Sequence, residues 1–169
     1  TKVKKTGVYF KNTKTRKPIL ILGIGNLLLK DEGVGIHVVQ KMKKMHLFRR
    51  ARFRNVEIMD GGTAGLDLLS YMEGRKKVIV IDSVRGGRKP GTIYRLTPEN
   101  LKTDTNKILS LHQIDFQQAL HLAGQLGKYP EAVIIGIEPK DFSSWGMELS
   151  PVIRKRIPKI IELVMEEVK

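Results

Sequence analysis

The chain has 169 residues, of which 41% are hydrophobic; it contains no cysteine and carries a formal net charge of +14. This length suits a single domain, and the lack of cysteine excludes disulfides and thiolate sites. No run approaches the roughly 18–20 apolar residues of a membrane span. We therefore expect a cytoplasmic protein without membrane insertion. The positive charge comes from residues 1–17 and 41–54, which each contain seven Lys or Arg and no acid. Because no nucleic-acid-binding signature is present, we expect no nucleic-acid partner. We interpret the first segment as a solvated extension and the second as the basic end of a helix.

Strand and helix patterns alternate along residues 18–169, which we expect to form one domain after the basic extension 1–17. Short apolar runs rich in branched residues predict strands, and amphipathic stretches predict helices. The predicted strands cover residues 19–23, 56–59, 77–81, 92–96 and 132–137. The predicted helices cover residues 34–48, 63–73, 113–126 and 151–167. This order predicts an α/β fold with a mainly parallel five-stranded sheet, helices on both faces and one antiparallel edge strand, residues 92–96.

Three further features come from single residues and short stretches. Pro158 should kink the last helix or split it in two. Residues 97–110 read as a polar connection, and Gly74 as the end of the second helix. Serine catalysis is not favoured, because no Gly-x-Ser-x-Gly motif is present.

The first predicted strand ends in a glycine loop, Gly23-Ile-Gly25, and the next helix begins about ten residues later. A Gly-x-Gly after a strand is part of the dinucleotide-binding fingerprint, but Leu28 stands where its third glycine belongs. The late helix start also removes the helix N-terminus that would bind a pyrophosphate. A nucleotide-binding α/β enzyme therefore stays as an alternative only.

Acidic residues follow three of the predicted strands. Asp31 and Glu32 lie in the loop after the first, Asp60 ends the second and Asp82 ends the third. Because the carboxyl ends of parallel strands share one edge of a sheet, these acids can converge, although Asp31 or Glu32 could equally favour a helix dipole and Asp60 a turn. His112 ends a polar loop, and one imidazole with two carboxylates suits an open site for nickel or zinc.

Five motifs, in order, resemble those of the hydrogenase maturation proteases, which trim the large subunit of nickel–iron hydrogenases. The motifs are Gly23-Ile-Gly-Asn-Leu-Leu-Leu-Lys-Asp-Glu-Gly-Val-Gly35, Asp60-Gly-Gly-Thr-Ala-Gly65, Ile81-Asp82 with Pro90-Gly-Thr92, Ser110-Leu-His-Gln113 and Gly136-Ile-Glu-Pro139. The resemblance extends over residues 18–165. It implies an α/β/α sandwich, and an endopeptidase that removes a C-terminal peptide from the nickel-loaded precursor of the large subunit, with nickel as the recognition signal.

The family's metal-binding residues correspond to Glu32, Asp82 and His112, with nickel supplied by the precursor and zinc or cadmium able to stand in for it. Asp60 is the acid of the family's Asp-Gly-Gly-Thr motif. We therefore expect a monomeric, aspartyl-type peptidase in which Asp60, Glu32 or Asp82 activates water, or water bound to the metal attacks. Leu111 replaces the proline that commonly precedes the histidine. A nickel carrier or docking protein without proteolysis is a second alternative.

Overall fold

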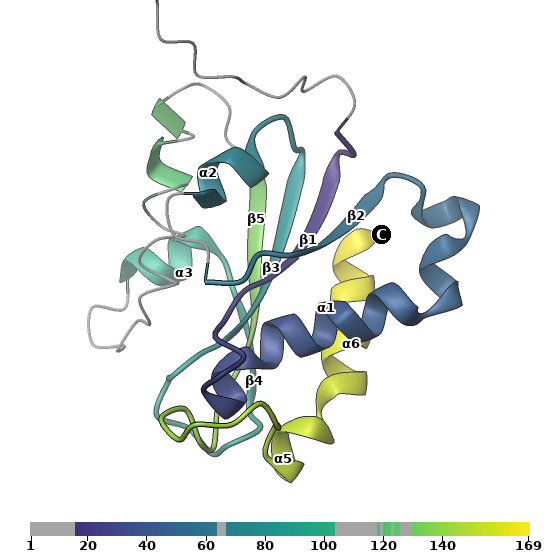
Figure 1. Ribbon diagram of the computed structural model, residues 1–169. Coiled ribbons are helices and arrows are strands. Elements are labelled where there is room, and N and C mark those ends of the chain that lie inside the picture. Colours follow the sequence, from purple (N-terminus) through teal and green to yellow (C-terminus); the bar gives the residue numbers. More distant parts are fainter. Residues whose placement is uncertain (1–15, 64–66, 104–117, 119, 123, 126–129) are drawn as a thin grey trace, which may run out of the picture.

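The computed structural model describes residues 16–63, 67–103, 118, 120–122, 124, 125 and 130–169. Its centre is a five-stranded sheet with the strand order β2-β1-β3-β5-β4 (Figure 1). The strands are β1 (Ile19–Gly23), β2 (Val56–Asp60), β3 (Lys77–Ser83), β4 (Ile93–Leu96) and β5 (Glu131–Ile137). The pairs along β2, β1, β3 and β5 are parallel, and β4 lies antiparallel to β5 at one edge. The predicted sheet and its antiparallel edge strand are confirmed.

Helices cover both faces of this sheet. They are α1 (Val34–Lys44), α2 (Asp67–Met72), α3 (Pro98–Thr103), α5 (Pro151–Arg154) and α6 (Ile157–Val168), with 3-10 turns η2 (Lys30–Gly33), η3 (His46–Arg49) and η4 (Ala51–Phe53). Successive strand residues point to opposite faces, so Ile79 packs with the buried residues of α1 and α6, and its neighbours Val78 and Val80 pack with those of α2. The predicted α/β/α layering is confirmed.

Several predicted boundaries were wrong by a few residues. The first helix ends at Lys44 instead of residue 48, because Met45 takes an extended conformation with ψ of 123°. Strand β3 continues to Ser83, since Ser83 still pairs with Ile137 of β5, so Asp82 lies within the strand and not after it. Residues 98–103 form α3 where we expected a polar connection.

Two predicted helix endings were right. The last helix is split between Arg154 and Ile157, with Pro158 in the first turn of α6, where its missing N–H costs nothing. Gly74 follows α2 with a positive φ of 74°, the conformation of a helix terminator.

Some predictions fall outside the described residues. These are residues 1–15 of the basic extension, 64–66 of the second helix, 104–110 of the polar connection, 111–117, which include His112 and the start of the third helix, and 119, 123 and 126 of that helix. The described residues between 118 and 125 are helical. Among the described helices, none is long and apolar enough to cross a membrane.

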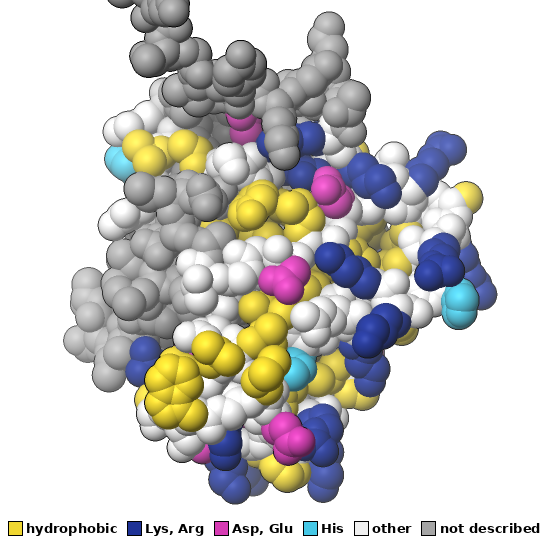
Figure 2. Space-filling model, viewed as in Figure 1, with side chains coloured by type: hydrophobic (Ala, Val, Ile, Leu, Met, Phe, Trp, Pro, Cys, Tyr) yellow, Lys and Arg dark blue, Asp and Glu magenta, His cyan; other side chains and the backbone are white. Residues whose placement is uncertain are grey.

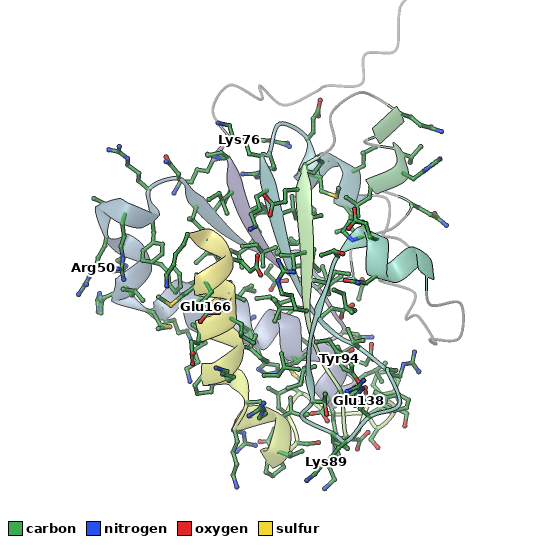
Figure 3. The ribbon with its side chains drawn as sticks, turned by 180° about the vertical axis from the view of Figure 1, so that it is seen from behind. Arg50, Lys76, Lys89, Tyr94, Glu138 and Glu166 are labelled. Carbon is green, nitrogen blue, oxygen red and sulfur yellow. The ribbon has the colours of Figure 1, made fainter. Side chains whose placement is uncertain are left out.

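The basic segment 41–54 covers the far end of α1 and the two turns that follow it. Lys41, Lys43 and Lys44 occupy the last turn of α1, where positive charge favours the helix dipole. Figure 2 shows Lys and Arg side chains gathered at this end of the molecule, and Figure 3 shows Arg50 among them. This arrangement agrees with the interpretation of a solvated helix end.

Two glycines bring α1 against the sheet and so determine where the loop before it lies. A Cβ atom at Gly35 would lie 2.1 Å from the carbonyl oxygen of Ile81, and one at Gly23 would lie 2.2 Å from the carbonyl oxygen of Gly35. Neither contact is sterically possible, so only glycine allows the helix to approach this closely. The loop of residues 24–33 is thereby fixed over the carboxyl ends of β1 and β3.

Candidate active site

The first backbone N–H groups of the loop between β1 and α1 are hydrogen-bonded within the protein. The N–H groups of residues 24–26 donate to the carbonyl oxygens of Ile81, Gly62 and Glu32, with N···O distances of 3.0, 2.9 and 3.2 Å. A phosphate cradle needs such N–H groups pointing at its ligand. Because these three are already satisfied within the protein, the geometry argues against the nucleotide-binding alternative.

Glu32 and Asp82 lie at the same point of the sheet edge and are linked by Ser83. Both carboxylates belong to buried residues, with exposed fractions of 8% for Glu32 and 0% for Asp82. The Ser83 hydroxyl donates to Glu32 Oε1 at 3.0 Å, and the Ser83 N–H donates to Asp82 Oδ1 at 2.8 Å. The structure therefore brings together two of the four acids that the sequence placed near this edge.

Asp60 lies at the same edge but two strands away. Gly23 of β1 pairs with Asp60 on one side and with Ile81 on the other. Asp60 is therefore separated from Ile81 by two strand spacings, roughly 10 Å. Its side chain is exposed, and Oδ1 accepts a hydrogen bond from the Gly62 N–H at 2.9 Å, which is the turn role that the sequence suggested. The carboxylate is accessible to a substrate lying along the edge.

The third predicted metal ligand, His112, lies outside the described residues. Among those that are described, no group of three or more His, Asp or Glu side chains is placed to hold a metal ion. Glu32 and Asp82 supply carboxylate oxygens, which together with an imidazole nitrogen form a donor set suited to a divalent ion of borderline softness. The described part of the site is thus chemically compatible with the predicted ligand set.

Asp31 has a role that the sequence did not reveal. It is fully buried and accepts four hydrogen bonds from the segment between β5 and α5. Its Oδ2 accepts from the N–H groups of Lys140 (3.0 Å) and Asp141 (2.8 Å) and from the Ser150 hydroxyl (2.8 Å). Its Oδ1 accepts from the Ser150 N–H at 2.7 Å. The sequence allowed either a helix-dipole contact or a place among the converging acids, but Asp31 instead anchors a distant loop beside the site.

Glu138 fixes the loop that follows β3. Its carboxylate accepts hydrogen bonds from the N–H groups of Gly86 (2.7 Å) and Gly87 (3.1 Å) and from the Tyr94 hydroxyl (2.6 Å), and Figure 3 shows Tyr94 and Glu138 side by side. Burial raises the pKa of Tyr94, and the hydrogen bond to Glu138 and the charge of its carboxylate raise it further, to about 12. The motif Gly136-Ile-Glu-Pro139 was the sequence signal for this residue.

Comparison with known proteins shows which family this chain resembles. The family model for hydrogenase maturation proteases matches residues 36–167, a range that begins just after the loop carrying Glu32. The hydrogenase expression/formation protein HupD of Bradyrhizobium diazoefficiens is 39% identical over 150 residues, which cover 88% of this chain and 76% of HupD.

Two solved structures are similar over nearly the whole fold. The hydrogenase maturating endopeptidase HybD from E. coli is 31% identical, with a TM-score of 0.75 and coverage of 89% of this chain and 91% of that one. The NiFe hydrogenase maturation protease HybD from Thermococcus kodakarensis is 26% identical, with a TM-score of 0.72 and coverage of 89% and 99%. These likenesses agree with the five motifs found in the sequence.

Proposed function

The chain belongs to the hydrogenase maturation protease family and is a peptidase, and we propose that it removes the C-terminal peptide from the nickel-loaded precursor of a nickel–iron hydrogenase large subunit. The observation that carries this proposal is the pair of buried carboxylates, Glu32 and Asp82, which Ser83 joins at the carboxyl edge of the sheet. That edge is where α/β proteins bind their ligands. The relative from Thermococcus kodakarensis is a maturation protease of a NiFe hydrogenase, which supports a nickel–iron hydrogenase as the class of substrate.

Nickel enters this proposal as part of the substrate. Glu32, Asp82 and His112 would bind the nickel of the incoming precursor, with zinc or cadmium as substitutes. Burying two carboxylates costs free energy, and a divalent cation between them offsets that cost. A precursor without nickel lacks this coordination energy and is not held in the position that cleavage requires. The metal therefore acts as a checkpoint for maturation.

Asp60 is the general base in this proposal. It is exposed at the same edge as the carboxylate pair, and its strand β2 is two strand spacings, roughly 10 Å, from β3, which leaves room for a peptide and a water molecule. Asp60 takes a proton from water as the water oxygen attacks the scissile carbonyl carbon. The proton then passes to the nitrogen of the leaving peptide as the carbon–nitrogen bond breaks. This assignment makes the protein an aspartyl-type peptidase, and the remaining alternatives are that Glu32 or Asp82 activates the water or that metal-bound water attacks.

The test is to mix the purified protein with nickel-loaded and nickel-free precursor and to measure the mass of the large subunit. We expect shortening of the loaded form only. Glu32→Gln and His112→Ala should abolish the preference for loaded precursor, whereas Asp60→Asn should slow cleavage by about 10²–10⁴-fold and keep nickel-dependent binding. Glu166→Gln and His46→Ala are matched controls at exposed positions and should cleave normally.

Each outcome has a separate meaning. If neither form of the precursor is cleaved, the proposed function is wrong. Nickel-dependent binding without cleavage of loaded precursor would favour the carrier alternative. Unchanged activity of Glu32→Gln and His112→Ala would refute the assigned metal site and leave the family membership intact. Normal cleavage by Asp60→Asn would exclude Asp60 as the base and point to Glu32, Asp82 or attack by metal-bound water.

A further inference from the structure

Four large hydrophobic side chains are exposed on the loops beside the candidate active site. Their exposed fractions are 78% for Trp145, 57% for Met147, 50% for Leu28 and 39% for Phe142, and we call them the Trp145 patch. Figure 2 shows hydrophobic side chains gathered at the end of the molecule where, in Figure 1, the segment between β5 and α5 lies. Exposed groups of this kind mark interaction sites more often than single apolar residues do.

Backbone contacts join the two loops of the patch into one surface. The Gly146 N–H donates to the Leu28 carbonyl oxygen at 2.9 Å, and the Lys30 N–H donates to the Gly146 carbonyl oxygen at 2.7 Å. His37 Nε2 of α1 lies 3.0 Å from the carbonyl oxygen of Met147. Leu28 and the segment around Trp145 are therefore neighbours held by the main chain.

The patch is also fixed to the candidate active site at two points. The guanidinium of Arg85, two residues after Ser83, lies 4.8 Å from the centre of the Phe142 ring. Asp31, which precedes Glu32, accepts hydrogen bonds from backbone N–H groups at both ends of residues 140–150, which we call the exposed loop. A protein segment docked on the patch would thus lie next to Glu32 and Ser83.

The exposed loop is internally braced as well. The Asp141 carboxylate accepts hydrogen bonds from the N–H groups of Ser143 (3.3 Å) and Ser144 (3.0 Å), and Lys30 Nζ lies 3.3 Å from its Oδ2. The Ser144 N–H lowers the pKa of Asp141, with smaller contributions from Ser143 and Lys30, to about 2. Because the loop is already ordered, Trp145 can bind a partner without a large loss of conformational entropy.

We propose that the Trp145 patch docks an apolar segment of the hydrogenase large-subunit precursor, an inference that rests on the proposed function. A large side chain has an area on the order of 150–250 Å². Scaled by the exposed fractions of the four residues, the exposed area of the patch is roughly 400–500 Å². A standard interface takes ~800 Å² from each partner, so the patch is too small for a stable dimer and suits a substrate that must be released. A second copy of a chain with a net charge of +14 would also be repelled.

Positive charge at the rim of the Trp145 patch indicates which charge the docked segment should carry. Arg85 and exposed Lys140 have no ion pair with any carboxylate among the described residues, whereas Lys30 is paired with Asp141. Cations at the rim of an apolar contact favour partners of opposite charge. The docked segment is therefore expected to carry a carboxylate beside its apolar side chains.

The experiment measures precursor binding and cleavage separately, with the full chain and nickel-loaded precursor. Trp145→Ser and Met147→Ser should each weaken binding, with Trp145→Ser raising both the dissociation constant and the precursor concentration for half-maximal cleavage by about tenfold. The rate at saturation should not change, and Trp145→Phe should restore most of the affinity. Leu122→Ser is the matched control, because Leu122 is 37% exposed and the described residues between 118 and 125 lie at the opposite end of the sheet from the patch (Figure 1).

The outcomes separate this inference from the proposed function. Binding through Trp145 without cleavage would contradict the proposed function and support the docking surface. Cleavage with unchanged half-maximal concentration in both serine variants would overturn the docking surface alone. A wild-type dimer that Trp145→Ser converts to a monomer in analytical ultracentrifugation would show that the patch joins two copies, and would also overturn it. Absence of any precursor binding by the wild type would overturn both.

Discussion

Replacing Asp31 by asparagine tests whether one buried carboxylate holds the segment between β5 and α5. The four donors on Asp31 come from Lys140, Asp141 and Ser150, and an asparagine amide nitrogen cannot accept from any of them. In either orientation of the amide, at least one backbone N–H loses its acceptor, which costs about 1–3 kcal/mol. The other bonds change from charged to neutral and weaken by roughly 1 kcal/mol each.

Part of this loss is recovered, because asparagine does not require burial of a negative charge. We therefore expect Asp31→Asn to lower the free energy of unfolding by about 3 kcal/mol, a large part of the 5–15 kcal/mol that is typical of a domain. Urea unfolding at neutral pH measures this change. Limited proteolysis should also show faster cleavage within residues 140–150, since the freed amides lie at both ends of that segment.

Asp60→Asn is the matched control, because Asp60 is exposed and accepts one hydrogen bond within its own turn. Asparagine favours such turns, so the change in stability should stay within about 0.5 kcal/mol. An Asp31→Asn variant that unfolds like the wild type and resists protease equally would refute the anchoring role. The hydrogen bonds would then be present without a net contribution to stability.

Two further predictions concern the packing of α1 and the loop after β3. Gly35→Ala would normally stabilise a helix, but here the new Cβ would lie 2.1 Å from the Ile81 carbonyl oxygen, so we expect a loss of about 1–3 kcal/mol in urea unfolding, with exposed Gln40→Ala as a neutral control. A more stable Gly35→Ala variant would contradict this contact. The Tyr94 pKa is raised from 10.0 to about 12, so the neutral phenol bound to Glu138 stabilises the fold fully below pH 10.0 and ceases to do so as the pH rises through about 12. Tyr94→Phe should remove roughly 1 kcal/mol at neutral pH and flatten this alkaline loss, and an ordinary pKa in a phenolate absorbance titration would contradict it.

The strands and their layering could be predicted because they depend on local patterns. Short apolar runs marked β1, β2, β3 and β5, and the position of β4 at an edge followed from its alternating polarity. Helix α3 was missed because its six residues, Pro98–Thr103, are too few to show helical periodicity. The extension of β3 to Ser83 depends on pairing with Ile137, which is information that no local window contains.

The candidate site divides in the same way. Glu32 and Asp82 could be identified from motifs and from the rule that strand ends share an edge. Ser83, which links them, and Asp31, which anchors a loop, act through contacts separated by 51 and up to 119 residues in the sequence. The amino-acid sequence alone does not distinguish a buried carboxylate that accepts backbone hydrogen bonds from one that faces a metal. Only the partners, brought in by tertiary packing, separate the two roles.

The two neighbouring acids of η2 therefore do different work because of the turn that carries them. In a 3-10 helix successive side chains diverge by about a third of a turn, so Asp31 and Glu32 cannot face the same partner. Asp31 binds the segment that carries Trp145, and Glu32 binds Ser83 at the sheet edge. If the patch docks the precursor and Glu32 contacts its nickel, a single short turn determines the distance between docking and metal recognition. A shift of η2 would move the contacts of Asp31 and of Glu32 together. Binding of the precursor at the Trp145 patch would therefore be coupled to recognition of its nickel.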